Sequence, residues 1–125
     1  MSALKRLHWI ARGSLVFMFA YHGLVPKLLW LSQGERTMIQ AHGITQVEMF
    51  AYAAGAAEIG LALWLLLARR SALPLIVAAT ALAGLLLDVA IFNPAMLKEA
   101  FNPVTLNVAG LALCAMAWNT RLEQR

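Results

Sequence analysis

Five polar or ionisable side chains lie inside long apolar stretches of this sequence: His22, Lys27, Glu58, Asp88 and Asn107. If these stretches cross a membrane, a charge at mid-depth costs at least about 2.5–3.5 kcal/mol, so such side chains normally line a cavity or pair with one another. Carboxyl and imidazole groups can carry protons, and ammonium and amide groups can donate hydrogen bonds to a ligand. We therefore predict a polar intramembrane cavity, with Glu58 as proton carrier and His22 as its relay or hydrogen-bond partner.

Four further residue assignments complete the predicted cavity. Lys27 and Asn107 are expected to orient oxygen atoms of a ligand, and Asp88 and Asn102 are additional candidate ligand contacts. A rise of about 1.5 Å per residue places the set between the midplane and the outer leaflet. The half of the membrane nearer to the basic segment ends contains no comparable set. The alternative is that these residues form pairs that only hold helices together, because buried ion pairs are weak evidence of function.

The composition indicates a membrane protein of one domain, residues 1–125. The chain is 62% hydrophobic and 13% charged, against roughly 45–50% and about 25% in soluble proteins. The excess apolar surface is expected to face the lipid bilayer. The net charge of +4 comes from scattered residues, without the basic stripe that binds nucleic acid, so nucleic acid is not an expected partner. The single cysteine, Cys114, excludes disulfides and cysteine-rich metal sites within the chain.

Four apolar segments approach the length of about 20 residues that a spanning helix needs: about 8–31, 47–68, 72–92 and 103–119. The predicted fold is thus all-α, a four-transmembrane-helix bundle. The first segment is too long for a signal peptide and has no convincing cleavage site after it, so we expect it to be retained. The polar loop Ser32–Gln46 is expected to contain a short surface helix ending at Gly43.

Lysine and arginine are distributed unevenly between the two sides of such a bundle. Seven lie at the N-terminus, in the turn between the second and third segments and at the C-terminus, against two in the other loops. Because cytoplasmic loops are enriched in these residues, both termini are expected in the cytoplasm and the protein in the inner cell membrane.

Proline and asparagine mark ends and a bend of the helices. Asn102 and Pro103 form a typical helix start, an asparagine cap followed by proline at the first position. Pro26 cannot donate to the carbonyl of His22, so a kink is expected there. The kink either brings His22 and Lys27 to one cavity, or Lys27 extends to the outer membrane interface.

Three segments of the sequence resemble the DoxX-like family of small membrane proteins. They are Tyr21-His22-Gly23-Leu24-Val25-Pro26-Lys27-Leu28, Ala54-Gly55-Ala56-Ala57-Glu58 and Phe101-Asn102-Pro103-Val104-Thr105-Leu106-Asn107. The resemblance covers nearly the whole chain and implies a four-helix membrane bundle. All the candidate residues except Asp88 lie in these segments.

The resemblance leaves three functions open. The founding member of the family resembles a subunit of a thiosulfate:quinone oxidoreductase, which implies a quinone or another small ligand and an oxidoreductase partner subunit that supplies electrons. Other relatives imply a non-catalytic assembly factor. A small transporter is the third alternative, and four helices would then require a homo-oligomer. The chain itself has no dinucleotide-binding glycine motif, and His22 has no second intramembrane histidine with which to hold haem, so neither a resident cofactor nor a metal is expected.

Overall fold

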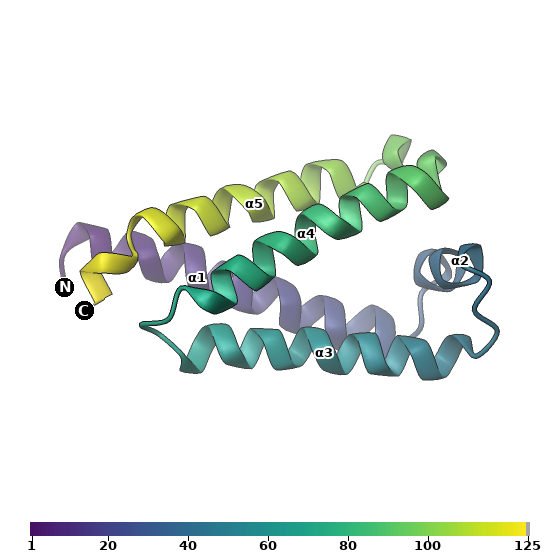
Figure 1. The fold of residues 1–125 in the computed structure, drawn as a ribbon, viewed down its shortest axis with the longest axis horizontal. Coiled ribbons are helices and arrows are strands. Elements are labelled where there is room, and N and C mark those ends of the chain that lie inside the picture. Colours follow the sequence, from purple (N-terminus) through teal and green to yellow (C-terminus); the bar gives the residue numbers. More distant parts are fainter. Residues whose placement is uncertain (125) are drawn as a thin grey trace.

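The computed structural model describes residues 1–124 as an arrangement of helices without strands (Figure 1). In chain order the elements are α1 (Ala3–Gly23), the π-helix η1 (Leu24–Leu29), α2 (Gln33–Ala41), α3 (Val47–Leu67), α4 (Leu73–Phe92), the 3-10 helix η2 (Pro94–Lys98), α5 (Pro103–Asn119) and the 3-10 helix η3 (Arg121–Gln124). The predicted all-α class is confirmed, and the bounds of α3, α4 and α5 agree with the predicted segments to within one residue. The short helix predicted in the first loop is α2, and Gly43 follows it with a φ of +78° that favours glycine.

The long helices form a bundle with two distinct ends. Helix α1 packs against α3 and α5, and α4 packs against α5. Both described ends of the chain and the α3–α4 turn lie at one end of the bundle, whereas α2 and η2 lie at the other (Figure 1). The core between the helices is apolar and includes Leu15, Phe19, Leu65, Leu75 and Leu82.

The outside of the bundle is also apolar, as expected for lipid contact. Helices α3 and α4 are long and apolar enough to cross a membrane, with mean hydropathies of 1.7 and 2.4. The continuous helix Ala3–Leu29 and α2 qualify as a third span only as a pair bent by 86°, and the apolar α5 is shorter, at 17 residues. Large side chains such as Phe17, Leu67 and Ile91 are mostly exposed on these surfaces. Such an extensive apolar exterior belongs in lipid rather than water.

Two glycines set the distance between α1 and α3. A Cβ atom added to Gly23 would lie 2.6 Å from the carbonyl oxygen of Gly55, and one added to Gly55 would lie 2.7 Å from the carbonyl oxygen of Gly23. The two backbones therefore touch, as is common where small residues meet in membrane helices. Lys27 lies one turn after Gly23 and Glu58 one turn after Gly55, but the two helices run in opposite directions (Figure 1). The contact therefore places Lys27 beside Gly55 and Glu58 beside Gly23, because the Cβ atoms added to Gly55 and Gly23 would lie 3.1 Å from Cβ of Lys27 and of Glu58, respectively. From these positions the two long side chains reach each other.

Small residues on α4 do not have the same role. Gly84 lies four residues before Asp88 and therefore shares its face of α4. In the structure Gly84 is exposed, and a Cβ atom added there meets no atom within 4 Å. On this face Asp88 contacts His42, in the loop that follows α2.

Candidate functional site: an ion-paired cluster around Lys27

The ammonium group of Lys27 is the centre of the most buried ion-paired cluster among the described residues. Its Nζ lies 2.9 Å from Oε1 of Glu58 on α3 and 3.0 Å from Oε1 of Glu35 on α2. It also donates a hydrogen bond of 3.2 Å to the carbonyl oxygen of His22. The Lys27 side chain is only 8% exposed. Lys27 therefore lies inside the protein, and we call Lys27, Glu35, Glu58 and the carbonyl of His22 the Lys27 cluster.

The local helix geometry explains why the carbonyl of His22 is free to accept this bond. In an α-helix the N–H of residue 26 would donate to it, but residue 26 is proline and has no N–H. The chain widens into the π-helix η1 at this point. The predicted kink at Pro26 thus takes the form of a π-helical turn, and the sharp bend comes after Leu29, before α2.

Glu35 is a member of the cluster that the sequence analysis missed. Ser32 and Glu35 have the spacing of a capping box, in which the glutamate side chain returns to the N–H of the cap residue. Here the Ser32 side chain accepts from the N–H of Glu35 at 3.2 Å, but the N–H of Ser32 donates to the carbonyl of Pro26. The Glu35 carboxylate is therefore not needed for the cap and accepts from Lys27. The signal that the sequence offered at Glu35 was its spacing from Ser32, which indicates a helix cap and not the ion pair with Lys27.

Glu58 carries an unsatisfied oxygen. Its Oε1 accepts from Lys27, but Oε2 is buried and has no hydrogen-bond partner among the described residues. A buried polar atom without a partner destabilises a fold by about 1–3 kcal/mol, more if it is charged. Such an atom is accommodated when a proton, a ligand or a water molecule occupies the position next to it. Glu58 is thus held by Lys27 through one oxygen, while its other oxygen is enclosed without a partner among the described residues.

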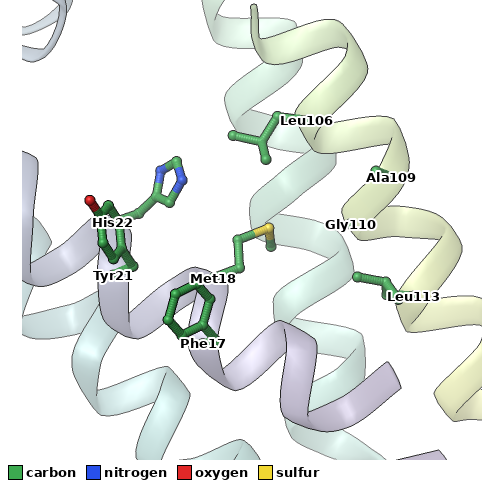
Figure 2. Close-up of a pocket in the computed structure, with 8 residues that line it drawn as sticks. All are labelled: Phe17, Met18, Tyr21, His22, Leu106, Ala109, Gly110 and Leu113. Atoms are coloured by element: carbon green, nitrogen blue, oxygen red, sulfur yellow. The ribbon is translucent and has the colours of Figure 1, made fainter. Parts of the chain in front are cut away.

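The side chain of His22 lines a groove between α1 and α5 (Figure 2). The groove has a volume of about 270 Å³ and an almost entirely apolar lining. The imidazole forms no hydrogen bond with a described residue, and its contact with the ring of Tyr21 is edge-on, at a centroid distance of 6.4 Å. His22 therefore joins two features: its carbonyl oxygen binds Lys27, and its ring lines the groove.

The two asparagines predicted as ligand contacts lie elsewhere. Asn107 is buried between α5 and α4, where its Nδ2 donates to the carbonyl of Leu82 at 2.8 Å. Asn102 is the N-cap of α5, because its side chain accepts from the N–H of Thr105 at 3.0 Å, and Pro103 is the first helical residue. The predicted helix start is confirmed. Both asparagines thus have backbone partners, and neither belongs to the Lys27 cluster.

Asp88 pairs with His42 instead of Lys27. The distance from its Oδ1 to Nε2 of His42 is 2.7 Å, and Nδ1 of the same ring lies 2.7 Å from the carbonyl oxygen of Met38. Both acceptors need an N–H donor, so both bonds form together only when the ring is protonated. The hydrogen bonds to Met38 and to Asp88 accordingly raise the pKa of His42. The ring also stacks on Phe92.

A second polar set occupies the opposite half of the bundle, where the sequence analysis expected none. Arg12, one of the seven basic residues counted above as orientation signals, is fully buried and donates to the carbonyls of Leu65 and Ala68 at 2.6 Å. It caps the C-terminus of α3, where unpaired carbonyls carry partial negative charge. His8, also fully buried, contacts the carbonyl of Ala117 through Nδ1 at 3.1 Å. The neighbours of Arg12 and His8 in the sequence are mostly apolar and did not indicate that either side chain would contact the end of another helix.

Metal ligands do not gather anywhere in the described part of the chain: no group of three or more His, Cys, Asp or Glu side chains is placed to hold an ion. The helices, the apolar exterior and the Lys27 cluster together define a helical membrane protein with a buried ionised site. More particularly, the chain belongs to the DoxX-like family, whose model matches residues 16–115, from α1 to α5. The match confirms the resemblance seen in the sequence, and comparisons with curated proteins and with solved structures gave no match.

Proposed function

We propose that this protein crosses the inner cell membrane four times, with both termini in the cytoplasm. The arrangement of charges supports this orientation, because Lys5, Arg6, Arg69, Arg70 and Arg121 all belong to segments at the end of the bundle that contains the termini (Figure 1). Helix α5, with 17 residues, reaches about 26 Å at 1.5 Å per residue. This length is at the short end of the range for a spanning helix.

We further propose that the Lys27 cluster serves a membrane subunit of a redox complex, which binds a quinone or a similar small lipid-soluble molecule. The observation that carries this proposal is the buried, unpartnered Oε2 of Glu58 beside an ammonium group. A carboxyl group that is held on one side and free on the other can accept or release a proton at a fixed position. The predicted assignment of Glu58 as proton carrier keeps its support from this geometry.

Each residue around the Lys27 cluster has a separate role in this proposal. A quinone supplies the redox chemistry, and the electrons come from a partner subunit. Lys27 holds Glu58 and Glu35 in position and compensates one of their two negative charges, which lowers the cost of a carboxylate inside the bundle. The His22 ring offers a hydrogen bond to the ligand from the groove side. Asn107 and Asp88 support the helices and the outer loop around the site.

A non-catalytic assembly subunit is the second candidate, and one observation favours it. The three acceptors of Lys27 come from α1, α2 and α3, so the cluster also ties three elements together. In that case the cluster serves only to hold the helices in one arrangement. Charge-neutralising variants would then lower the amount of protein in the membrane without a separable chemical defect.

Native mass spectrometry of the gently purified protein separates the two candidates, when co-purifying small molecules and subunits are identified. We expect a stoichiometric quinone in the wild type and its loss in Glu58→Gln at unchanged expression. Glu48→Gln is the matched control, because Glu48 lies on the same helix but is exposed and pairs only with Arg36 among the described residues.

The opposite results point to assembly. A partner protein without any small ligand, or a Glu58→Gln variant that retains its quinone and its activity, contradicts the redox proposal. Loss of the ligand in Glu48→Gln as well would show that the effect is not specific to the Lys27 cluster.

A further inference from the structure

The groove between α1 and α5 presents one polar group within an apolar surface. Phe17, Met18, Tyr21 and His22 line it from α1, and Leu106 and Gly110 line it from α5 (Figure 2). Gly110 is buried, and a Cβ atom added there would lie 2.8 Å from Leu82 and 3.1 Å from Met18, so the backbone of α5 forms a closely packed floor of the groove at that position. The imidazole of His22 and the thioether of Met18 both project from α1 toward α5 in Figure 2.

The groove is open along the side of the bundle rather than at its ends. Phe17 is 68% exposed, Tyr21 50% and Leu106 39%, although all three line it. These residues belong to the apolar surface that faces lipid in a membrane. A molecule dissolved in the bilayer therefore reaches the groove sideways, without passing through water.

The ring of His22 requires a partner in this setting. Hydrocarbon has no water that could bond to an exposed polar group, and a polar group transferred to an apolar environment without a hydrogen bond costs roughly 2–7 kcal/mol. No described residue bonds to the imidazole. A lipid acyl chain could fill the groove but offers no donor or acceptor to the ring. The partner must therefore combine an apolar body with a hydrogen-bonding oxygen.

We propose that the α1–α5 groove is a lateral binding site for a ring-bearing lipid-soluble molecule, with a carbonyl or hydroxyl oxygen on His22. The aromatic side chains of Phe17 and Tyr21 flank the groove, with ring centroids 5.7 Å apart, and offer apolar contact to a planar ring. This inference rests on the proposed function for the class of ligand, and it adds the place and the route of entry. The oxygen of the ligand then bonds to the imidazole of His22, the residue whose backbone carbonyl accepts from Lys27.

The site can be tested by NMR of ¹⁵N-labelled histidine side chains in nanodiscs, with decylubiquinone as the probe. The chain has only three histidines, and His8 and His42 lie outside the groove, so they are internal controls. We expect the His22 resonances, assigned by their loss in His22→Phe, to shift saturably. Decylbenzene, which has a ring and the same chain but no oxygen, should not cause this shift.

Two variants of α5 locate the probe independently of His22. Ala109 lines the groove and Ala112, three residues further on, does not, although both are exposed. Ala109→Leu narrows the groove and is expected to raise the dissociation constant at least about tenfold, whereas Ala112→Leu leaves it unchanged.

The outcomes also separate this inference from the proposed redox function. Equilibrium dialysis measures binding of the probe independently of the NMR shifts. If the probe binds but the His22 resonances do not shift, or if it binds Ala109→Leu and the wild type with equal affinity, the groove is not the site, and the redox proposal survives. Equal shifts with decylbenzene show apolar filling only and overturn the hydrogen bond to His22. If the groove binds the probe while Glu58→Gln retains full activity in the native complex, the groove stands and the redox proposal fails.

Discussion

At the scale of single residues, the cost of burying charge decides what Lys27 and its neighbours do. Lys27 is 8% and Glu58 18% exposed, so neither charge is well solvated. Removing one partner of a buried ion pair leaves an uncompensated charge, which is typically more damaging than replacing both. The stability of this protein should therefore depend on which member of the cluster is changed.

We expect Lys27→Met to lower the free energy of unfolding by about 3–5 kcal/mol, because it leaves two carboxylates without their cation. Glu58→Gln should cost less, since Lys27 keeps Glu35 and the carbonyl of His22. The double variant should recover part of the loss. Unfolding in mild detergent measures all three, with Lys98→Met, an exposed position, as the control. Equal losses for the two single variants would contradict this order.

At the scale of the elements, two local features place the cluster. The contact between Gly23 and Gly55 allows α1 and α3 to approach. Helix α2 covers the end of the bundle opposite the termini through Glu35, Arg36 and the loop residue His42. The first is a packing constraint that depends on side-chain volume. The second is a set of ion pairs, one of which depends on the protonation of histidine.

Gly55→Ala tests the packing constraint. The added methyl group would lie 2.7 Å from the carbonyl oxygen of Gly23, and overpacking of this kind costs typically about 1–3 kcal/mol. Gly60→Ala on the same helix is the matched control, because nothing lies within 4 Å of its added Cβ atom, and alanine favours helix over glycine by up to about 1 kcal/mol. We expect a lower melting temperature for Gly55→Ala and an equal or higher one for Gly60→Ala. A similar fall in both would refute the contact.

The attachment of α2 should weaken as pH rises. Hydrogen bonds to the Met38 carbonyl and to Asp88 raise the pKa of His42 above its ordinary value of about 6.5. A raised pKa in the folded state means that the stabilisation is fully present below the unfolded-state value and is lost as pH rises through the folded-state value. Hydrogen exchange of residues 33–46, corrected for intrinsic rates, should show faster opening of α2 above that pKa.

His42→Gln is the control for this pH dependence, since glutamine keeps hydrogen-bonding capacity but does not titrate near neutral pH. We expect the exchange of α2 in this variant to be the same on both sides of the transition. If the wild type shows no transition either, His42 does not hold α2 against α4.

At the scale of the whole molecule, the two ends of the bundle differ in chemistry. One end has the termini and the basic α3–α4 turn, whereas the other has α2 and η2 (Figure 1). The buried Arg12 and His8 contact the C-terminal ends of α3 and α5 at the first end, and the Lys27 cluster includes Glu35 of α2 at the second. The apolar exterior between them suits lipid. The ion-paired site therefore lies nearer to the face that we propose to be outside the cytoplasm.

Cysteine labelling in intact cells tests this orientation. In a Cys114→Ala background, single cysteines at Gln40 or Ala100, both exposed at the end with α2 and η2, should react with a membrane-impermeant maleimide from outside. Cysteines at Ser2 or Arg70, exposed at the opposite end, should react only after the cells are lysed. The reverse pattern would show the opposite orientation, and labelling of all four positions from outside would argue against spanning helices.

The positions of the helices could be predicted because their causes are local. Apolar runs end at Arg69 and at Asn93 before Pro94, and one begins at the Asn102–Pro103 cap. Each of these signals involves residues within a few positions of one another. The structure confirms them. Lys27 and Glu58 could be selected as well, since charges are rare in apolar runs. The capping of α3 by Arg12 was not predictable, because a basic residue near the end of an apolar segment is equally typical of an orientation signal.

The sequence by itself determined where this protein forms helices, that its exterior is apolar and that Lys27 and Asn107 are buried among them. Only the tertiary structure decided the partners. Glu35 reaches Lys27 across the bend after η1, His42 reaches Asp88 over 46 residues, and Arg12 reaches the end of α3 over 53 residues. The physical reason is that helix formation depends on neighbouring residues, whereas ion pairing depends on which faces meet when backbones approach, as they do at Gly23 and Gly55.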